Sequence, residues 1–202
     1  MAEALMRQCV AGRGESASIS SAGLLAPDHP CPPEIVAMMA EIGLDLSEHR
    51  SRRLTEELIE PADLVLTMER QHLREVSVMV PAAWERTFTL KEIVRRGAEI
   101  GWRSGRQPLE QWLVRLHAER ETADLLGTSS TDDVADPHGG TPEQYAATKL
   151  ELQSLIGELA ELIWPDEAAQ LGFASGGAVE PDAAPVPEPG GRRPRLGLSR
   201  RR

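Results

Sequence analysis

Aromatic side chains are scarce in this sequence, and other features that often identify a protein are missing. Phe, Trp and Tyr make up only 3% of the 202 residues, so few rings are available to stack on a flat ligand. The only cysteines are Cys9 and Cys31, too few for a disulfide scaffold and too far from other ligand residues for a zinc site. We therefore expect no bound metal and no cofactor.

Long apolar runs and a basic surplus are also lacking. No stretch approaches the ~18 apolar residues that a membrane-spanning helix needs. Residues 1–7 have none of the features of a signal peptide, which favours a cytoplasmic protein. The formal net charge is -10, from 22 Lys and Arg against 32 Asp and Glu, and this argues against a nucleic-acid partner.

The composition changes near Pro165. Residues 1–164 have a helical and strand-like pattern of apolar residues and carry most of the negative charge. Residues 165–202 are rich in Ala, Gly and Pro and end in a segment with six arginines. We expect one folded domain over 1–164 and a disordered tail with a basic end over 165–202. For the arginines, solvation is the default expectation and contact with an anionic partner the alternative.

Helix and strand signals alternate along the first 164 residues. Thr141, Pro142 and Gln144 form the start signal of a helix whose apolar stripe runs to Ile163. Further helices are expected over residues 1–9, over 33–43 and from Pro108 onward, and strands over residues 18–23, 62–67 and 86–90. This order predicts an α/β protein with a parallel sheet.

One acidic loop stands directly before the last predicted helix. Asp136 is followed by Pro137 and, after one residue, by Gly139 and Gly140. This composition first of all indicates a turn. The alternative is that Asp136 is a loop carboxylate that serves as a general acid.

Basic and histidine residues give weaker signals. Arg50, Arg52 and Arg53 lie in a charged connector, for which a solvated surface is the default and anion binding the alternative. His49 and His72 have no Ser or Cys partner at a recognisable spacing. Neither histidine is therefore a catalytic candidate.

Five segments, taken together and in order, resemble the low molecular weight protein-tyrosine phosphatases. They are residues 1–7 (MAEALMR), 21–23 (SAG), 43–55 (GLDLSEHRSRRLT), 62–69 (ADLVLTME) and the Asp136–Pro137 pair. The resemblance implies a doubly wound four-stranded parallel sheet, of order 2-1-3-4, flanked by helices. It also implies hydrolysis of a phosphorylated protein or a small phosphomonoester through a phosphocysteine, with Asp136 as general acid.

The residues that carry the nucleophilic step in this family are not in the sequence. The family's Cys-x5-Arg loop, which supplies the nucleophile and the phosphate-binding arginine, is followed by Pro-Met-Ala-Glu-Ala-Leu, and this sequence begins at that Met. Glu15 and Ala37 stand where Cys9 and Cys31 would need an arginine. We expect a sequence that starts at an internal methionine, lacks the first strand, and is inactive as written.

Further differences from the family indicate which substrate and which class of function to expect. His138 and Gly139, and residues 24–26 (LLA), stand where family members carry aromatic residues beside a phosphotyrosine ring, so such a ring would lack stacking partners. A non-catalytic binding module of the same fold is the main alternative. An arsenate reductase on this scaffold is disfavoured, because its disulfide relay needs further cysteines and none follows Cys31.

Overall fold

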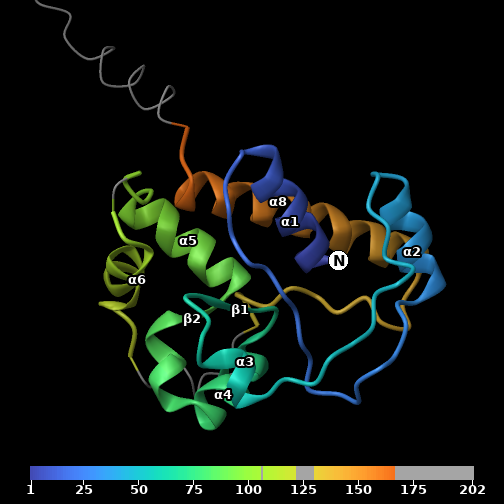
Figure 1. The fold of residues 1–202 in the computed structure, drawn as a ribbon, viewed down its shortest axis with the longest axis horizontal. Coiled ribbons are helices and arrows are strands. Elements are labelled where there is room, and N and C mark those ends of the chain that lie inside the picture. The colour runs from blue at the N-terminus through green and yellow to red at the C-terminus, as the bar shows by residue number, and fades with distance from the viewer. Residues whose placement is uncertain (106, 122–129, 167–202) are drawn as a thin grey trace, which may run out of the picture.

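The computed structural model describes residues 1–105, 107–121 and 130–166, in which ten helices and strands are assigned (Figure 1). In chain order they are α1 (Ala2–Gly12), α2 (Pro33–Ala40), α3 (Glu56–Ile59), β1 (Val65–Thr67), α4 (Arg70–Met79), the 3-10 helix η1 (Pro81–Arg86), β2 (Thr87–Thr89), α5 (Leu90–Ile100), α6 (Leu109–His117) and α8 (Pro142–Ile163). The tail expected after residue 164 lies almost wholly outside the described residues.

The sheet is parallel, which confirms the α/β class. Strands β1 and β2 pair with Val65 opposite Thr87 and Thr67 opposite Thr89. They match the strands predicted over residues 62–67 and 86–90 but are shorter. Parallel strands covered on both faces are typical of proteins in which helices connect the strands.

The strand expected over residues 18–23 is wrong for the described structure. Gly23 forms only an isolated bridge with Arg53. The preceding carbonyls are occupied by arginine side chains, because Arg7 donates to the Ile19 oxygen at 2.6 Å and Arg52 donates to the Ser21 oxygen at 2.9 Å. A segment whose carbonyls are bound in this way adds no strand to the sheet. The sheet of the described residues therefore has two strands, where the order 2-1-3-4 without its first strand predicted three.

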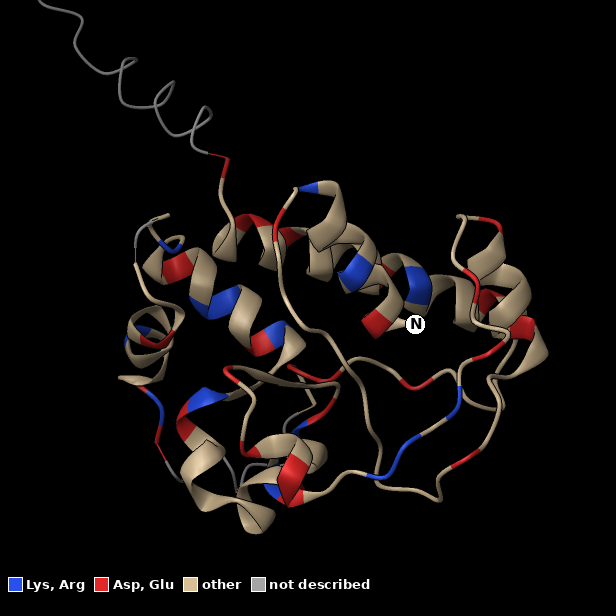
Figure 2. Cartoon of the chain, viewed as in Figure 1, with Lys and Arg blue, Asp and Glu red and all other residues tan. Residues whose placement is uncertain are grey.

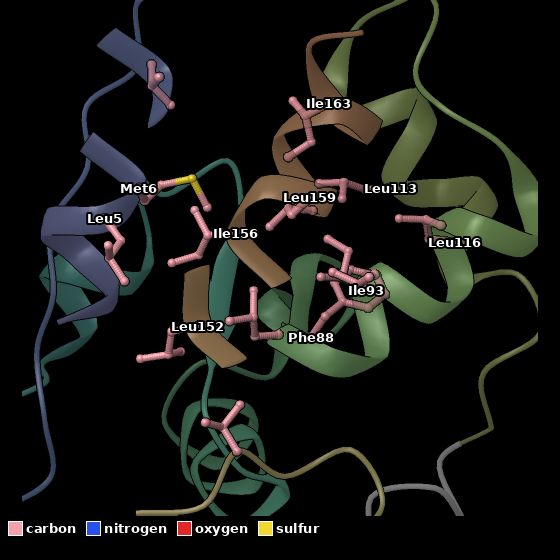
Figure 3. Close-up of a cluster of buried hydrophobic side chains, with 14 of the residues drawn as sticks. Leu5, Met6, Phe88, Ile93, Leu113, Leu116, Leu152, Ile156, Leu159 and Ile163 are labelled. Atoms are coloured by element: carbon pink, nitrogen blue, oxygen red, sulfur yellow. The ribbon is translucent and has the colours of Figure 1, made fainter. Parts of the chain in front are cut away.

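Helices cover both faces of this small sheet. Helices α1, α5 and α8 lie on one side of β1 and β2, and α3 and α4 lie on the other (Figure 1). The larger core fills the first side, where α8 contacts both α1 and α5 (Figure 3). Its buried members include Leu5, Met6, Phe88, Ile93, Leu113, Leu116, Leu152, Ile156, Leu159 and Ile163.

The predicted helices differ from the observed helices mainly in where they end. Helix α8 is confirmed with both hydrogen bonds of its capping box, between Thr141 and Gln144. Helix α2 ends at Ala40 instead of Gly43, because residues 41–43 form a turn in which Gly43 has a φ of 77°. Helix α1 continues past the predicted end at residue 9 to Gly12. The start of α8, which is fixed by side chains close in the sequence, was therefore predicted more accurately than the ends of α1 and α2.

A buried arginine joins β2, η1 and α6. The guanidinium of Arg120 lies over the ring of Trp84 at 3.6 Å and over that of Phe88 at 4.3 Å. Its Nε is 2.9 Å from the Glu92 carboxylate, and its Nη1 is 3.3 Å from Nδ1 of His117. A buried cation needs such compensation, since burial without an opposite charge is costly.

His117 makes the stability of this cluster depend on pH. Desolvation, and then the positive charges of Arg120 and Arg96, lower the pKa of His117 below its ordinary value of about 6.5, although Glu85 and Glu92 oppose the shift. The unfolded chain therefore binds the proton more strongly than the folded protein does. The stabilisation is present above pH 6.5 and is lost as the pH falls towards the lower pKa of the folded state.

We predict that His117→Gln reduces the loss of stability between pH 7 and pH 5. The measurement is the midpoint of thermal unfolding at several pH values, compared with the unsubstituted protein. His49→Gln, at an exposed position, is the matched control. An unchanged slope in the His117 variant would show that protonation of this residue does not oppose folding.

Candidate active site

The loop that carries Asp136 is attached to the carboxyl end of β1. The amide of Val134 donates to the Met68 carbonyl at 2.8 Å, and the amide of Arg70, the first residue of α4, donates to the Asp133 carboxylate at 2.8 Å. Asp133 thus caps a helix that begins 63 residues earlier in the chain. In open parallel sheets ligands bind outside the carboxyl ends of the strands, which is where this loop lies.

A buried carboxylate fixes the start of the same loop. Asp132 is only 6% exposed and accepts hydrogen bonds from Arg95 at 3.0 Å and from Arg70 at 3.4 Å. Hydrogen bonding to Asp132 raises the pKa of the Arg95 guanidinium, as expected for a charge-assisted pair. Neither acid was singled out from the sequence as an anchor, because their partners on α4 and α5 are distant in the chain.

Asp136 itself lies in a tight turn. Its carboxylate accepts the amide of His138 at 3.0 Å, and the amide of Gly140 donates to the Pro137 carbonyl at 2.8 Å. Gly139 has a φ of 73°, which favours glycine. The turn predicted from the composition is therefore present. The Asp136 side chain belongs to an exposed residue at the surface of the loop, so the turn and an acid accessible to a substrate are compatible.

A groove of about 720 Å³ opens beside this turn, between α2 and the first half of α8. Its charged or titratable lining residues are Glu34, Glu41, His138 and Lys149. Its apolar lining comes from Pro32, Ala37, Met38, Pro142, Tyr145 and Ala146. The volume is within the range of small-ligand sites, and His138 connects the groove to the Asp136 turn.

The five segments of the resemblance meet in two groups. Ser21 hydrogen-bonds the Glu3 carboxylate, and Gly23 donates to the Arg52 carbonyl at 2.8 Å, so the first three segments lie together. The fourth and fifth are joined through the Met68 and Val134 backbone. Arg50 and Arg52 direct their guanidinium groups to backbone carbonyls, which makes them part of this framework.

The surroundings of Cys31 are not those of an activated nucleophile. Burial raises the pKa of the Cys31 thiol, although the nearby Met1 amino group opposes the shift. Reactive cysteines in enzymes have a lowered pKa instead. Cys9 lies in the second half of α1, where its sulfur accepts a hydrogen bond from Arg13 at 2.8 Å. Burial lowers the pKa of the Met1 amino group, and the negative charges of Cys31 and Glu3 oppose this shift.

The described residues offer few sites of other kinds. Within residues 1–105, 107–121 and 130–166, no three His, Cys, Asp or Glu side chains gather in a way that would hold a metal ion. In the same residues, every helix is too short or too polar to pass through a membrane. The groove and the Asp136 turn remain the features on which a function can be argued.

Comparison with known proteins decides the family. Residues 1–102 match the family described as "Low molecular weight phosphotyrosine protein phosphatase". The chain is also 32% identical, over 167 residues, to the protein-arginine-phosphatase of Bacillus subtilis, covering 82% of this chain and 89% of that protein. The chain belongs to the low molecular weight protein-tyrosine-phosphatase family.

Other members of the phosphatase family agree with this result. The probable low molecular weight protein-tyrosine-phosphatase EpsP of Ralstonia solanacearum is 34% identical over 117 residues, which cover 57% of this chain and 78% of EpsP. The solution structure of a low molecular weight protein tyrosine phosphatase from Bacillus subtilis superposes with a TM-score of 0.59 at 30% identity, covering 82% of this chain and 89% of that one. The fold and the family predicted from the sequence are therefore confirmed.

The turn at Asp136 gives a stability test for this phosphatase-family loop. A Cβ at Gly140 would meet the Gln144 side chain that completes the capping box and would lie 2.9 Å from the Pro137 carbonyl. We predict that Gly140→Ala destabilises the protein by about 1–2 kcal/mol, because either the cap or the turn must shift.

Gly157 provides the matched control within α8. A Cβ there meets nothing within 4 Å, so Gly157→Ala should stabilise the protein by about 0.5–1 kcal/mol through the higher helix propensity of alanine. Urea unfolding of the two variants measures both effects. Equal effects of the two substitutions would contradict the close packing described for Gly140.

Proposed function

We propose that Asp136 is the general acid of a phosphatase site that acts on phosphorylated protein side chains. The observation that carries the proposal is the position of Asp136. Its carboxylate lies on an exposed turn whose preceding residues are bound to the end of β1 and to the start of α4. A rigidly attached loop with an exposed carboxylate can present a proton to a bound substrate at a defined place.

The proposed reaction has two steps. In the first, a thiolate attacks phosphorus, the bond between phosphorus and the leaving atom breaks, and Asp136 gives its proton to that atom. In the second, Asp136 takes a proton from water as the water oxygen attacks the phosphocysteine and the thiolate leaves. The thiolate and the phosphate-binding arginine belong to a Cys-x5-Arg loop, and this motif does not occur in the 202 residues.

Two observations favour phosphoarginine over phosphotyrosine as the substrate. The relative that is 32% identical over 82% of this chain is named a protein-arginine-phosphatase. In addition, Tyr145 is buried and its hydroxyl oxygen accepts a hydrogen bond from Gly139 at 3.3 Å, so its ring is held in the fold. His138 and Gly139 then leave no Phe, Tyr or Trp side chain on the turn to stack on a phosphotyrosine ring.

Non-catalytic binding is the second candidate function, and the groove beside the Asp136 turn is the observation that favours it. An acid without a nucleophile and a phosphate cradle supplies only one part of a cooperative unit. The purified 202-residue protein should therefore show no cysteine-dependent turnover of an aryl phosphate or of a phosphoarginine peptide. Turnover that disappears in Cys9→Ser or Cys31→Ser would contradict this prediction and assign a nucleophile.

The role of Asp136 is tested in a fusion that places a family strand and Cys-x5-Arg loop before Met1. In this fusion Asp136→Asn should lower kcat by about 10²–10⁴-fold on a substrate with a poor leaving group, because the proton donor is lost. The loss should be smaller on an activated aryl phosphate, whose leaving group scarcely needs protonation. Steady-state kinetics on both substrates provide the measurement.

Asp133 supplies the control for this experiment. Asp133→Asn keeps an oxygen that can accept the Arg70 amide, so the loop should stay attached and kcat should change little. Asp133→Ala removes that acceptor and should lower stability, which separates anchoring from acid catalysis. Equal losses of kcat in Asp133→Asn and Asp136→Asn, or no loss in the latter, would reject Asp136 as the general acid.

A further inference from the structure

The groove between α2 and α8 has an apolar floor and an acidic rim. Glu34 lines it from α2 and Glu41 from the position directly after α2. Asp45 and Glu48 follow on the adjoining loop, outside the lining of the groove. Figure 2 shows this acidic ribbon along α2 and the loop after it. No Lys or Arg occurs between residues 33 and 49 of the sequence. The side facing the groove from α8 contributes Lys149, which is 3.7 Å from the Glu41 carboxylate.

Glu34 is the acid most available to a ligand. It is exposed, and no ion pair is found for it among the described residues. A complementary ligand would therefore carry positive charge for the rim together with apolar side chains for the floor. Lysine or arginine alone would satisfy only the first of these requirements.

The end of this chain has that composition. Residues 192–202 read RRPRLGLSRRR, with six arginines and the two apolar residues Leu196 and Leu198. The charge of the segment is opposite to that of residues 1–164, which carry a net negative charge. A segment tethered to its own binding site has an effective concentration in the millimolar range, so even weak pairing becomes significant.

The intervening chain is long enough to reach the groove. Helix α8 has 22 residues and is about 33 Å long, and the groove lies along its first half. Between Asp166, shortly after the end of α8, and Arg192 there are 25 residues of sequence. A flexible linker of this length has an average span of about 25–30 Å and a maximum near 85 Å.

We propose that residues 192–202 bind in the groove between α2 and the first half of α8. The arginines pair with the rim that contains Glu34, and Leu196 and Leu198 cover the apolar floor that contains Met38. Because His138 of the Asp136 turn lines the same groove, the bound segment excludes other peptides from the space beside Asp136. The C-terminus is thus a built-in competitor for peptides that approach this turn.

A labelled synthetic peptide of residues 190–202 is the probe. Fluorescence anisotropy compares its binding to the unsubstituted 202-residue protein and to a full-length variant in which Arg192, Arg193, Arg195, Arg200, Arg201 and Arg202 are replaced by Gln. We expect binding to the variant, and binding at least about tenfold weaker to the unsubstituted protein, whose own segment occupies the groove. Equal affinities, or no binding to the variant, would overturn the proposal.

Substitutions in the groove locate the contact. Glu34→Gln, introduced into the arginine-free variant, should weaken peptide binding by about two- to fivefold. Glu110→Gln makes the same change of charge at an exposed position of α6 and should have no effect. Equal effects of Glu34→Gln and Glu110→Gln would show general attraction to an acidic protein and would reject the groove as the site.

Two further measurements distinguish binding of residues 192–202 of the same chain from other ways of filling the groove. A peptide with Leu196 and Leu198 replaced by Ser should bind more weakly, and unchanged binding would reject the apolar contact. In the unsubstituted protein, the amide NMR signals of Gly139 and Lys149 should differ from those of the arginine-free variant at every protein concentration. Differences that appear only at high concentration would instead indicate binding to a second copy. None of these readouts requires turnover, so they are independent of the role proposed for Asp136.

Discussion

Helix α8 is the element on which the rest of the structure depends. Two strands of three residues each bury too little surface to hold a domain together, and α8 compensates by contacting α1 along one side and α5 along the other. Five of its buried apolar residues repeat at helical spacing, from Leu152 to Ile163. Because the core fixes the rotation and register of α8, it also fixes where the helix begins. The turn at Asp136 and one wall of the groove lie at that beginning.

The Asp136 turn is held from both directions by different kinds of interaction. On its C-terminal side, the capping box of Thr141 and Gln144 ties it to α8. On its N-terminal side, Asp132 and Asp133 tie it to α4 and α5 through charged and backbone donors. The charged contacts are buried or half-buried, so removal of one partner would leave the other charge without compensation. Asp136 is therefore the exposed carboxylate of a segment whose neighbours are fixed.

Local signals explain how much of this arrangement was predictable from the sequence. The start of α8 was predicted because Thr141, Pro142 and Gln144 act on one another over three residues. The strands β1 and β2 were predicted from the short patterns over residues 62–67 and 86–90, and their parallel arrangement was predicted from the alternation of helices and strands. The cap that Asp133 places on α4 was missed, since the hydrogen bond joins residues 63 positions apart. The strand predicted over 18–23 was wrong for a similar reason, because the arginines that bind its carbonyls come from α1 and from the charged connector.

The family was predictable although the nucleophile was absent from the sequence, because a family fold is specified at many positions and its chemistry at few. Segments such as residues 62–69 and the Asp136–Pro137 pair are shaped by how the loop meets the sheet, and the structure joins them through Met68 and Val134. These contacts hold the acid in place whatever substrate it serves. In the function proposed above, substrate choice depends instead on the groove and on the two residues after Pro137. On that proposal the fold determines where Asp136 delivers a proton, whereas His138, Gly139 and the acidic residues beside the groove limit which segments approach it.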